Sequence, residues 1–440
     1  MRMMAAGTTT AEGTTRRYVS TREAAFIGVA AMVGAGIFSL LGTAGEVAGA
    51  AVWLSFALAG AIAALQGYSF AKLGARYPTA GGLLEYVNRG YGMGHIATIT
   101  AWLTYAANAI VTAMVAMSFG SYAASAFGST DLALTKAFAV GLVVLMTILN
   151  VLGSTVVAKV QSFIVFIVVG ILGVFAVVTI LNLDPAKLAP STYPGARDII
   201  SSIALTFFAF LGFGVVTFTA KDLREPSRQL PRAMAIAIGL ATVVYVAVAL
   251  GVFGTLSVDE VIAAGPTAIA VAAKPVLGDA GYWLMIVTAL FATAGATNAG
   301  LYPASGLSEE LASTGQFPPV MGRRLREQLP VGLLVASIVV VILVVGHDLS
   351  AIASIGSTVA LAIFCLVTIG HLRIYRKTGA RLSLLVVALA TAGISLITFV
   401  FTTLIQEPAS IVTLVVILAI SVVLDIGWSR PHPEALTEPA

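Results

Sequence analysis

Two pairs of glycines interrupt long apolar stretches of the chain: Gly34 with Gly36, and Gly212 with Gly214. A glycine inside a helix costs roughly 0.5–1 kcal/mol relative to alanine, and in a bilayer the freed backbone groups find no water. Such an interruption persists where the unwound backbone lines a cavity and its N–H and C=O groups bind something. The glycines therefore predict a site built from backbone hydrogen bonds. The alternative is that they are small-residue notches for helix packing.

Polar side chains also occur in the middle of apolar stretches. Asn108, Thr293 and Thr297 lie where an unsatisfied polar group is costly in a membrane. Thr293 and Thr297 are four residues apart, so they would share one face of a helix. Their hydroxyls could bind an ion, or they could donate back to their own helix as threonines commonly do.

Catalysis and metal binding are not indicated. The loop acids Asp222, Glu225, Glu309 and Glu310 are better explained by ion pairing with loop cations than as the acid cluster of a membrane enzyme. The four histidines are scattered and the one cysteine, Cys365, lies in an apolar segment, which does not match metal-ligand spacing. We expect no catalytic residue, no metal and no cofactor. A channel is also disfavoured, because the segments contain neither a filter-like loop nor a ring of acids.

The elements that position these residues must be membrane helices. Of 440 residues, 59% are hydrophobic and 10% are charged, with a mean hydropathy of +0.99. A soluble domain is about 45–50% apolar and about 25% charged. The composition predicts a multi-pass protein with the lipid bilayer as its surroundings. The sequence pI near 9.2 arises from lysines and arginines in loops, and no nucleic-acid partner is expected.

Twelve segments are long and apolar enough to be spans, given that about 20 residues cross a bilayer. They cover roughly 24–47, 50–74, 96–127, 134–152, 159–181, 198–220, 232–254, 281–311, 331–346, 349–371, 382–405 and 408–427. Twenty of the 24 lysines and arginines then fall on one side, which the positive-inside rule identifies as the cytoplasm. We expect a protein of the cytoplasmic membrane with both termini inside and no removable signal peptide. The stretch 76–95 is predicted to be a short amphipathic helix at the interface, and 255–280 to hold two short outer helices.

The two glycine pairs fall in spans one and six, five spans apart. Interrupted helices at corresponding positions of two halves are typical of inverted-repeat transporters. This predicts an all-α, five-plus-five inverted repeat with two additional C-terminal helices. The expected parts are a cytoplasmic tail (1–21), a first repeat (22–182), a second repeat (183–376), spans eleven and twelve (377–429) and a second tail (430–440).

The motifs, taken together, resemble those of the amino acid–polyamine–organocation (APC) superfamily, and within it the amino acid permeases. The matching stretches are 32–38 (MVGAGIF), 77–82 (YPTAGG) with 86–92, 207–213 (FFAFLGF), 222–232 (DLREPSRQLPR) and, more loosely, 297–299 and 313–318. The resemblance covers spans one to ten. It implies a LeuT-type fold in which helices one and six are broken, and alternating-access transport of an amino acid.

The resemblance also implies roles for individual residues. Backbone N–H groups of Ala35, Gly36 and Ile37 would hold the substrate carboxylate, aided by the positive end of the following half-helix. Carbonyls exposed at both breaks would hold the ammonium group: Met32, Val33, Phe208, Ala209 and Leu211. Phe208 and Phe213 would cover the ligand and act as gates, Asn108 is a further substrate contact, and Thr293 with Thr297 would form a sodium site.

The chain departs from the family pattern at two positions. Many relatives carry an acid where this chain has Gly214, and many sodium-independent relatives carry a lysine near the position of Val168. With no fixed anion in the pocket, a cationic substrate would bring an unpaired charge into a low dielectric, so a neutral amino acid is favoured. The coupling ion, sodium or proton, and the choice between symport and exchange stay open. So does a carrier of another solute on the same fold, such as an organic amine, a polyamine or an inorganic ion. Spans eleven and twelve lie outside the repeat and could form a homodimer interface.

Overall fold

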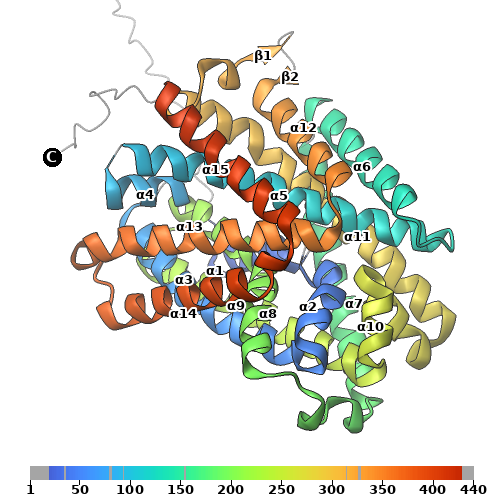
Figure 1. Ribbon diagram of the computed structural model, residues 1–440. Coiled ribbons are helices and arrows are strands. Elements are labelled where there is room, and N and C mark those ends of the chain that lie inside the picture. The colour runs from blue at the N-terminus through green and yellow to red at the C-terminus, as the bar shows by residue number, and fades with distance from the viewer. Residues whose placement is uncertain are drawn as a thin grey trace, which may run out of the picture.

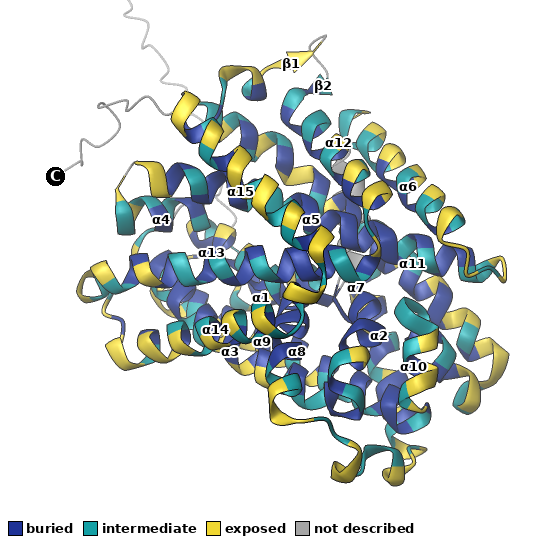
Figure 2. Cartoon of the chain, viewed as in Figure 1, coloured by how far each residue is buried: buried dark blue, intermediate teal, exposed yellow. Residues whose placement is uncertain are grey.

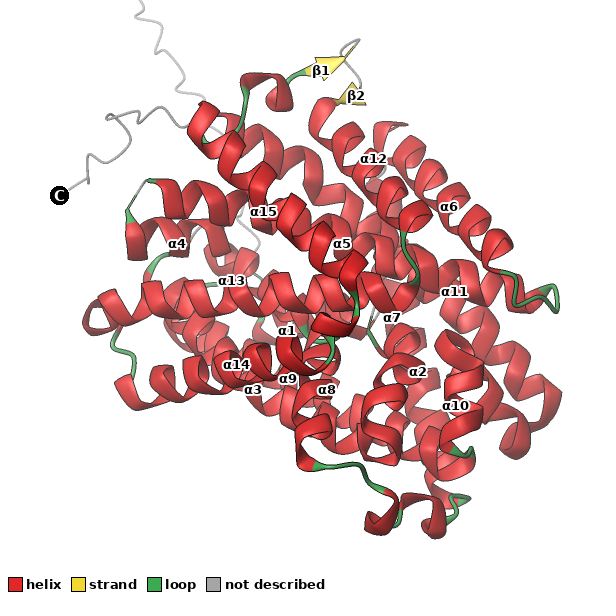
Figure 3. Ribbon diagram, viewed as in Figure 1, coloured by secondary structure: helices red, strands yellow, loops and turns green. Residues whose placement is uncertain are grey.

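The structure is a computed structural model that describes residues 19–33, 36–78, 82–92, 94–152, 155–313, 315–325 and 329–428; within 155–163 it describes the backbone alone. Nearly all of these residues are helical (Figure 3). Two very short strands, β1 (Arg324–Leu325) and β2 (Leu329–Pro330), pair antiparallel. The prediction of an all-α protein is confirmed.

The helices follow one another along the chain with short connections (Figure 1). The first half contains α1 (Thr21–Val33), α2 (Ile37–Ala48), α3 (Val52–Arg76), α4 (Leu83–Tyr91), α5 (His95–Ala126), α6 (Leu132–Leu152), α7 (Thr155–Leu181) and α8 (Ala196–Phe208). The second half contains the 3-10 helix η4 (Leu211–Asp222), α9 (Pro226–Thr255), α10 (Val258–Ala264), α11 (Ala268–Ser313), α12 (Val331–Gly346), α13 (Leu349–Thr378), α14 (Leu382–Thr402) and α15 (Pro408–Trp428). Shorter 3-10 turns are η1 (Gly49–Ala51), η2 (Pro185–Leu188), η3 (Pro190–Thr192), η5 (Gly265–Thr267), η6 (Pro319–Gly322) and η7 (Leu404–Gln406).

Within the described residues, ten helical segments are long and apolar enough to cross a membrane, and α12 is a shorter apolar helix. Four of the ten segments, 37–76, 196–222, 258–313 and 382–406, each combine more than one helix, so the segments do not correspond one to one with the twelve predicted spans. The short ninth segment was predicted at 331–346, which are the bounds of α12. The stretch 255–280, predicted to hold two short helices, contains α10 and the beginning of α11, which bends at Gly278, where φ is +68°.

One large core joins most of the helices, and burial decreases outward from it (Figure 2). Helices α8 and α13 are the most enclosed of the apolar segments, whereas α6 and α15 expose most of their length. Their exposed side chains are large and apolar, for example Leu145, Val415 and Val423. Apolar side chains on the outside of a bundle are what a lipid environment requires.

Helix α4 is the short amphipathic helix predicted between the second and third long segments. It buries Leu84, Tyr86 and Val87 and leaves Arg89 exposed. It packs against α13 and α5. Burial raises the pKa of the Tyr86 phenol well above its ordinary value, so this hydroxyl stays protonated.

Candidate functional site

The first interruption lies between α1, which ends at Val33, and α2, which begins at Ile37. Gly34, a predicted helix-break glycine, and Ala35, predicted to bind substrate, lie outside the described residues. Gly36 is the N-cap of α2, and its carbonyl accepts a hydrogen bond from the Leu40 N–H at 3.1 Å. Gly36 has no side chain with which to cap this helix, and no side-chain cap hydrogen bond is found at this position.

The second interruption lies between α8 and η4, and it does not fall where the glycines predicted it. Helix α8 ends at Phe208, and Ala209 and Phe210 form the turn before η4 begins at Leu211. Gly212 and Gly214 are therefore both inside η4 rather than at the break.

The two glycines of η4 differ in their surroundings. A Cβ atom on Gly212 would lie 2.4 Å from the carbonyl carbon of Ala31, whereas a Cβ on Gly214 would meet no atom within 4 Å. Gly212 is needed because the backbones of η4 and α1 approach closely at this position. At Gly214 there is room for a side chain, so packing does not require a glycine there.

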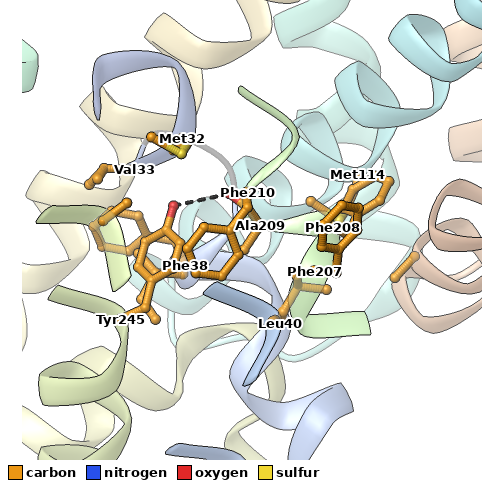
Figure 4. Close-up of a cluster of buried hydrophobic side chains, with 14 of the residues drawn as sticks. Met32, Val33, Phe38, Leu40, Met114, Phe207, Phe208, Ala209, Phe210 and Tyr245 are labelled. Atoms are coloured by element: carbon orange, nitrogen blue, oxygen red, sulfur yellow. Dashed lines mark hydrogen bonds between the residues drawn. The ribbon is translucent and has the colours of Figure 1, made fainter. Parts of the chain in front are cut away.

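The two interruptions meet directly. A Cβ atom on Gly36 would lie 2.1 Å from the Cβ and 2.3 Å from the Cα of Ala209. Figure 4 shows Met32 and Val33 at the end of α1 close to Ala209 and Phe210, with Phe38 of α2 alongside. The N-terminus of α2 and the C-terminus of α8 are thus brought together, although they are far apart in the sequence.

Tyr245 of α9 holds the second interruption in place. Its side chain is fully buried, and its hydroxyl donates to the Ala209 carbonyl at 3.1 Å (Figure 4). The ring also packs against Phe210, with centroids 5.0 Å apart, and against Phe56 at 5.5 Å. The Ala209 carbonyl, predicted to bind the substrate ammonium, therefore already accepts one hydrogen bond; a second lone pair is free in principle.

This arrangement suits a ligand that carries both signs of charge. The N-terminus of a helix carries roughly +0.5 elementary charge and the C-terminus roughly −0.5. At the contact of Gly36 with Ala209, the positive end of α2 and the negative end of α8 are adjacent. A zwitterion with its carboxylate at α2 and its ammonium at α8 would compensate both ends.

The two predicted gate residues, Phe208 and Phe213, pack against different neighbours. The Phe208 ring lies against Gly356, so close that a Cβ on Gly356 would be 2.2 Å from Cε2 of Phe208. Phe213 packs instead against Phe70 and Phe364, with centroids 5.5 and 5.1 Å away. Gly356 and Phe364 both belong to α13, about two turns apart.

Asn108 and the two threonines bond to helices. The Asn108 side-chain amide donates to the Gly300 carbonyl at 2.7 Å and links α5 to α11. Thr293 donates to the Ala289 carbonyl at 2.6 Å, and Thr297 to the Thr293 carbonyl at 2.9 Å. Both threonines are fully buried, and their oxygens keep lone pairs with which to accept or coordinate.

Two further polar residues lie near the interruptions: Tyr245, which the sequence analysis did not single out, and Ser357, which the sequence suggested could face the same cavity. Tyr245 is a hydroxyl-bearing side chain in an apolar helix, and that signal alone could have identified it. Ser357 follows Gly356, the residue against which Phe208 packs. Its hydroxyl is buried and finds no hydrogen-bond partner among the described residues. A buried hydroxyl without a partner is costly, which marks Ser357 as a candidate polar contact of the site.

A cavity of about 260 Å³ opens at the far end of α2 from Gly36. It is lined by Thr43 and Glu46 of α2, with Thr135 of α6 and Asp348 and Ser350 near the start of α13. The described residues contain no group of three histidines, cysteines, aspartates or glutamates that could hold a metal ion.

Comparison with known proteins places the chain in a family of transporters. Residues 19–426 match the amino acid permease family, so the chain belongs to that family and, as predicted, to the APC superfamily. It is similar to the inner membrane transport protein YbaT of Escherichia coli, with 31% identity over 92% of this chain and 94% of YbaT. It is also similar to the methylthioribose transporter of Bacillus subtilis (25% identity over 70% of this chain and 69% of the relative). The vacuolar cationic amino acid transporter 2 of Arabidopsis thaliana is 28% identical over 79% of this chain and 58% of the relative. The protein is a multi-pass membrane transporter of this family.

Proposed function

We propose that this protein is a secondary active transporter that moves neutral amino acids across the cytoplasmic membrane by alternating access. The substrate carboxylate binds the N–H groups at the start of α2, namely those of Gly36 and Ile37 together with Ala35. The ammonium group binds carbonyls at the ends of α1 and α8: Met32, Val33, Phe208, Ala209 and Leu211. The contact between Gly36 and Ala209 is the observation that carries this proposal, because it joins a positive and a negative helix end.

Preference for a neutral substrate rests on the charges of the surrounding helices. In α1, α2, α8 and η4, acidic residues occur only toward the ends that face away from the interruptions: Glu23, Glu46, Asp198 and Asp222. A cationic side chain on the substrate would have no fixed anion beside it in a low-dielectric site, which is costly. One relative is named for cationic amino acids, so this selectivity is a point on which family members differ.

The proposed architecture is twelve spans in a five-plus-five inverted repeat of the LeuT type. The paired interruptions, α1 with α2 and α8 with η4, are the half-helices of spans one and six. The first repeat covers 22–182 and the second 183–376, and 377–429 adds two further spans. Both termini face the cytoplasm.

Alternating access requires closed and open arrangements on each side of the site. The cavity next to Glu46 and Asp348 is a candidate route from the outer side, because it is reached along α2 from Gly36. Phe208 and Phe213 are the proposed gates toward the site. Thr293 and Thr297 are the proposed sodium ligands, and a proton is the alternative coupling ion.

The experiment that tests the proposal is a thermal-shift screen of the purified protein in detergent. All twenty amino acids are compared, with and without sodium, at two pH values. A ligand that binds the native state alone raises its stability by about 2.7 kcal/mol at a concentration 100 times its Kd. We expect several neutral amino acids to raise the melting temperature and arginine and lysine to leave it unchanged.

Two other results are informative. The melting temperature could instead rise with an organic amine, a polyamine or a thio-sugar and with no amino acid. That result would agree with a transporter but overturn the proposed substrate class. The thio-sugar is included because one relative is a methylthioribose transporter. A shift with neutral amino acids that does not depend on sodium would overturn the roles of Thr293 and Thr297.

A further inference from the structure

Positive side chains gather at one end of the bundle, where α3 and α13 end, α4 lies and α14 begins. The helices α3, α4, α13 and α14 contact one another in a chain of packed pairs. Together they contain six lysines and arginines, and Arg381, the N-cap of α14, adds a seventh. Glu85 is the single acidic residue in the sequences of these four helices. In Figure 1, α4 and the turn from α13 to α14 lie at the left of the molecule.

These cations are arranged on a frame of tyrosines. Arg373 lies 4.4 Å above the ring centroid of Tyr91, and Arg89 lies 5.0 Å from that of Tyr77. Three further cation–tyrosine contacts, at 5.8 to 6.0 Å, involve Lys72 with Tyr68, Arg76 with Tyr77 and Arg376 with Tyr375. A cation over an aromatic ring keeps its charge and its N–H donors available on the other face.

A close backbone contact and two hydrogen bonds connect the helices that carry these tyrosines. A Cβ atom on Gly90 would lie 2.6 Å from the Cα of Gly370, so α4 and α13 approach backbone to backbone. The hydroxyl of Tyr91 donates to the Leu366 carbonyl of α13 at 2.8 Å. The Arg381 N–H donates to the Tyr68 hydroxyl at 2.8 Å and ties the α13–α14 turn to α3.

Most of this positive charge is not neutralised by the protein. Arg89 pairs with Glu85 at 2.6 Å. The exposed side chains of Arg76, Arg373 and Arg381 have no ion pair with an acidic side chain in the described part of the chain. An unneutralised cluster of this size attracts an anionic partner.

The position of the cluster identifies the kind of anion. Exposed apolar side chains begin directly beside the cations: Ile369 lies one turn before Arg373, and Leu382 follows Arg381. Further along α14, Val386 is also exposed. A ligand that meets both surfaces must have a negative head and an apolar tail. Clusters of four to eight cations at the end of a membrane helix favour anionic lipids for this reason.

We propose that the surface formed by Arg76, Arg89, Arg373, Arg376 and Arg381 binds the headgroup of an anionic phospholipid, with the acyl chains against α13 and α14. The lipid bridges the end of α3 and α4 to the α13–α14 turn. This site is separate from the substrate site, and it depends on the placement of the protein in a membrane but not on the substrate class.

The test measures lipid binding to the purified full-length protein by native mass spectrometry and by thermal shift. The probes are phosphatidylglycerol and phosphatidylcholine with identical acyl chains. The variant R373Q/R381Q removes two cations from the site. The control R323Q/R324Q removes two exposed cations at the same end of the bundle, of which Arg324 pairs with Glu309 at 3.1 Å. They lie in the segment after α11, which is linked to α4 through the contact of Gln316 with Asn88.

We expect phosphatidylglycerol to bind in preference to phosphatidylcholine and to raise the melting temperature of the unaltered protein. Because each cation contributes about fivefold to binding at an anionic surface, R373Q/R381Q should bind phosphatidylglycerol about 25-fold more weakly. The control R323Q/R324Q and the charge-conserving R373K/R381K should keep most of the preference. A melting temperature of R373Q/R381Q in detergent without added lipid that matches that of the unaltered protein would show that the variant is folded.

Three results would overturn the proposal. Equal binding of the two lipids would exclude recognition of charge. An equal loss of phosphatidylglycerol binding in R373Q/R381Q and R323Q/R324Q would mean that the lipid is attracted to the positive surface in general and has no specific site. Displacement of phosphatidylglycerol by millimolar glycerol phosphate would mean a soluble phosphate ligand instead of a lipid.

Discussion

At the scale of single residues, Gly36 gives the sharpest prediction. An alanine in this position would gain roughly 0.5–1 kcal/mol of backbone preference, but its Cβ would lie 2.1 Å from that of Ala209. The overlap outweighs the preference, because the two backbones must move apart. We expect Gly36→Ala to reduce the uptake of neutral amino acids into proteoliposomes at least tenfold and to lower the melting temperature of the protein.

Gly214→Ala is the matched control. It lies in the other glycine pair, but its Cβ would meet no atom within 4 Å. Stability and uptake should both be close to those of the unaltered protein. If the two substitutions behaved alike, the close contact between the interruptions would not be a requirement for transport.

The Tyr245 hydroxyl gives a second prediction at this scale. Tyr245→Phe leaves the buried Ala209 carbonyl without this donor, which costs about 1–3 kcal/mol. The melting temperature and the uptake rate should both fall. Tyr122→Phe is the control: Tyr122 is also fully buried, but its hydroxyl has no hydrogen-bond partner among the described residues, so its removal should cost little. A larger loss in Tyr122→Phe would contradict the assignment.

At the scale of elements, a small second core fixes the segment that follows α11. Phe317 is fully buried and stacks on Trp102 of α5, with centroids 3.7 Å apart, and meets Tyr105 edge-on at 5.6 Å. Truncating a buried phenylalanine costs about 3–5 kcal/mol. We expect Phe317→Ala to release the segment and to raise the rate of trypsin cleavage at Arg323 and Arg324 at least tenfold.

The control for this prediction is Phe401→Ala on α14, where the side chain is 64% exposed on the lipid-facing surface. Removing the Phe401 ring should leave the rate of trypsin cleavage at Arg323 and Arg324 unchanged. Cleavage that is equally slow in both variants would show that hydrogen bonds, such as that from the Phe317 N–H to the Leu311 carbonyl, hold the segment without the ring.

The positions of most helices were predictable from hydropathy, but the second glycine pair did not mark the end of α8, which the family resemblance placed nearer, with exposed carbonyls at Phe208, Ala209 and Leu211. The first glycine pair predicted the break before α2 because Gly36 is at the break itself. The second pair did not, because Gly212 serves a close contact with α1 and the chain leaves α8 earlier, at Ala209. A glycine signals both unwinding and close approach, and the sequence does not separate these two causes.

At the scale of the whole molecule, the distribution of charge predicts the orientation. Twenty of the 24 lysines and arginines lie on the side assigned to the cytoplasm. We expect fluorescent-protein fusions after Trp428 and at the N-terminus to fluoresce, and alkaline phosphatase inserted in the 182–196 segment to be active. An active phosphatase fused at either terminus would contradict both the orientation and the even number of spans.

By itself the sequence determined that the protein is an all-helical, multi-pass transporter of the amino acid permease family, and it predicts a site at interrupted helices. These properties depend on hydropathy and on local backbone preference, which each segment carries in its own residues. Only the tertiary structure decided that Gly36 meets Ala209, that Tyr245 bonds to the Ala209 carbonyl, and that Arg373 lies over Tyr91. The contact of Gly36 with Ala209 depends on how closely two backbones approach. The other two contacts depend on which residue of one helix faces which residue of another. In an apolar bundle many such pairings bury similar surface, so only the packed structure selects among them.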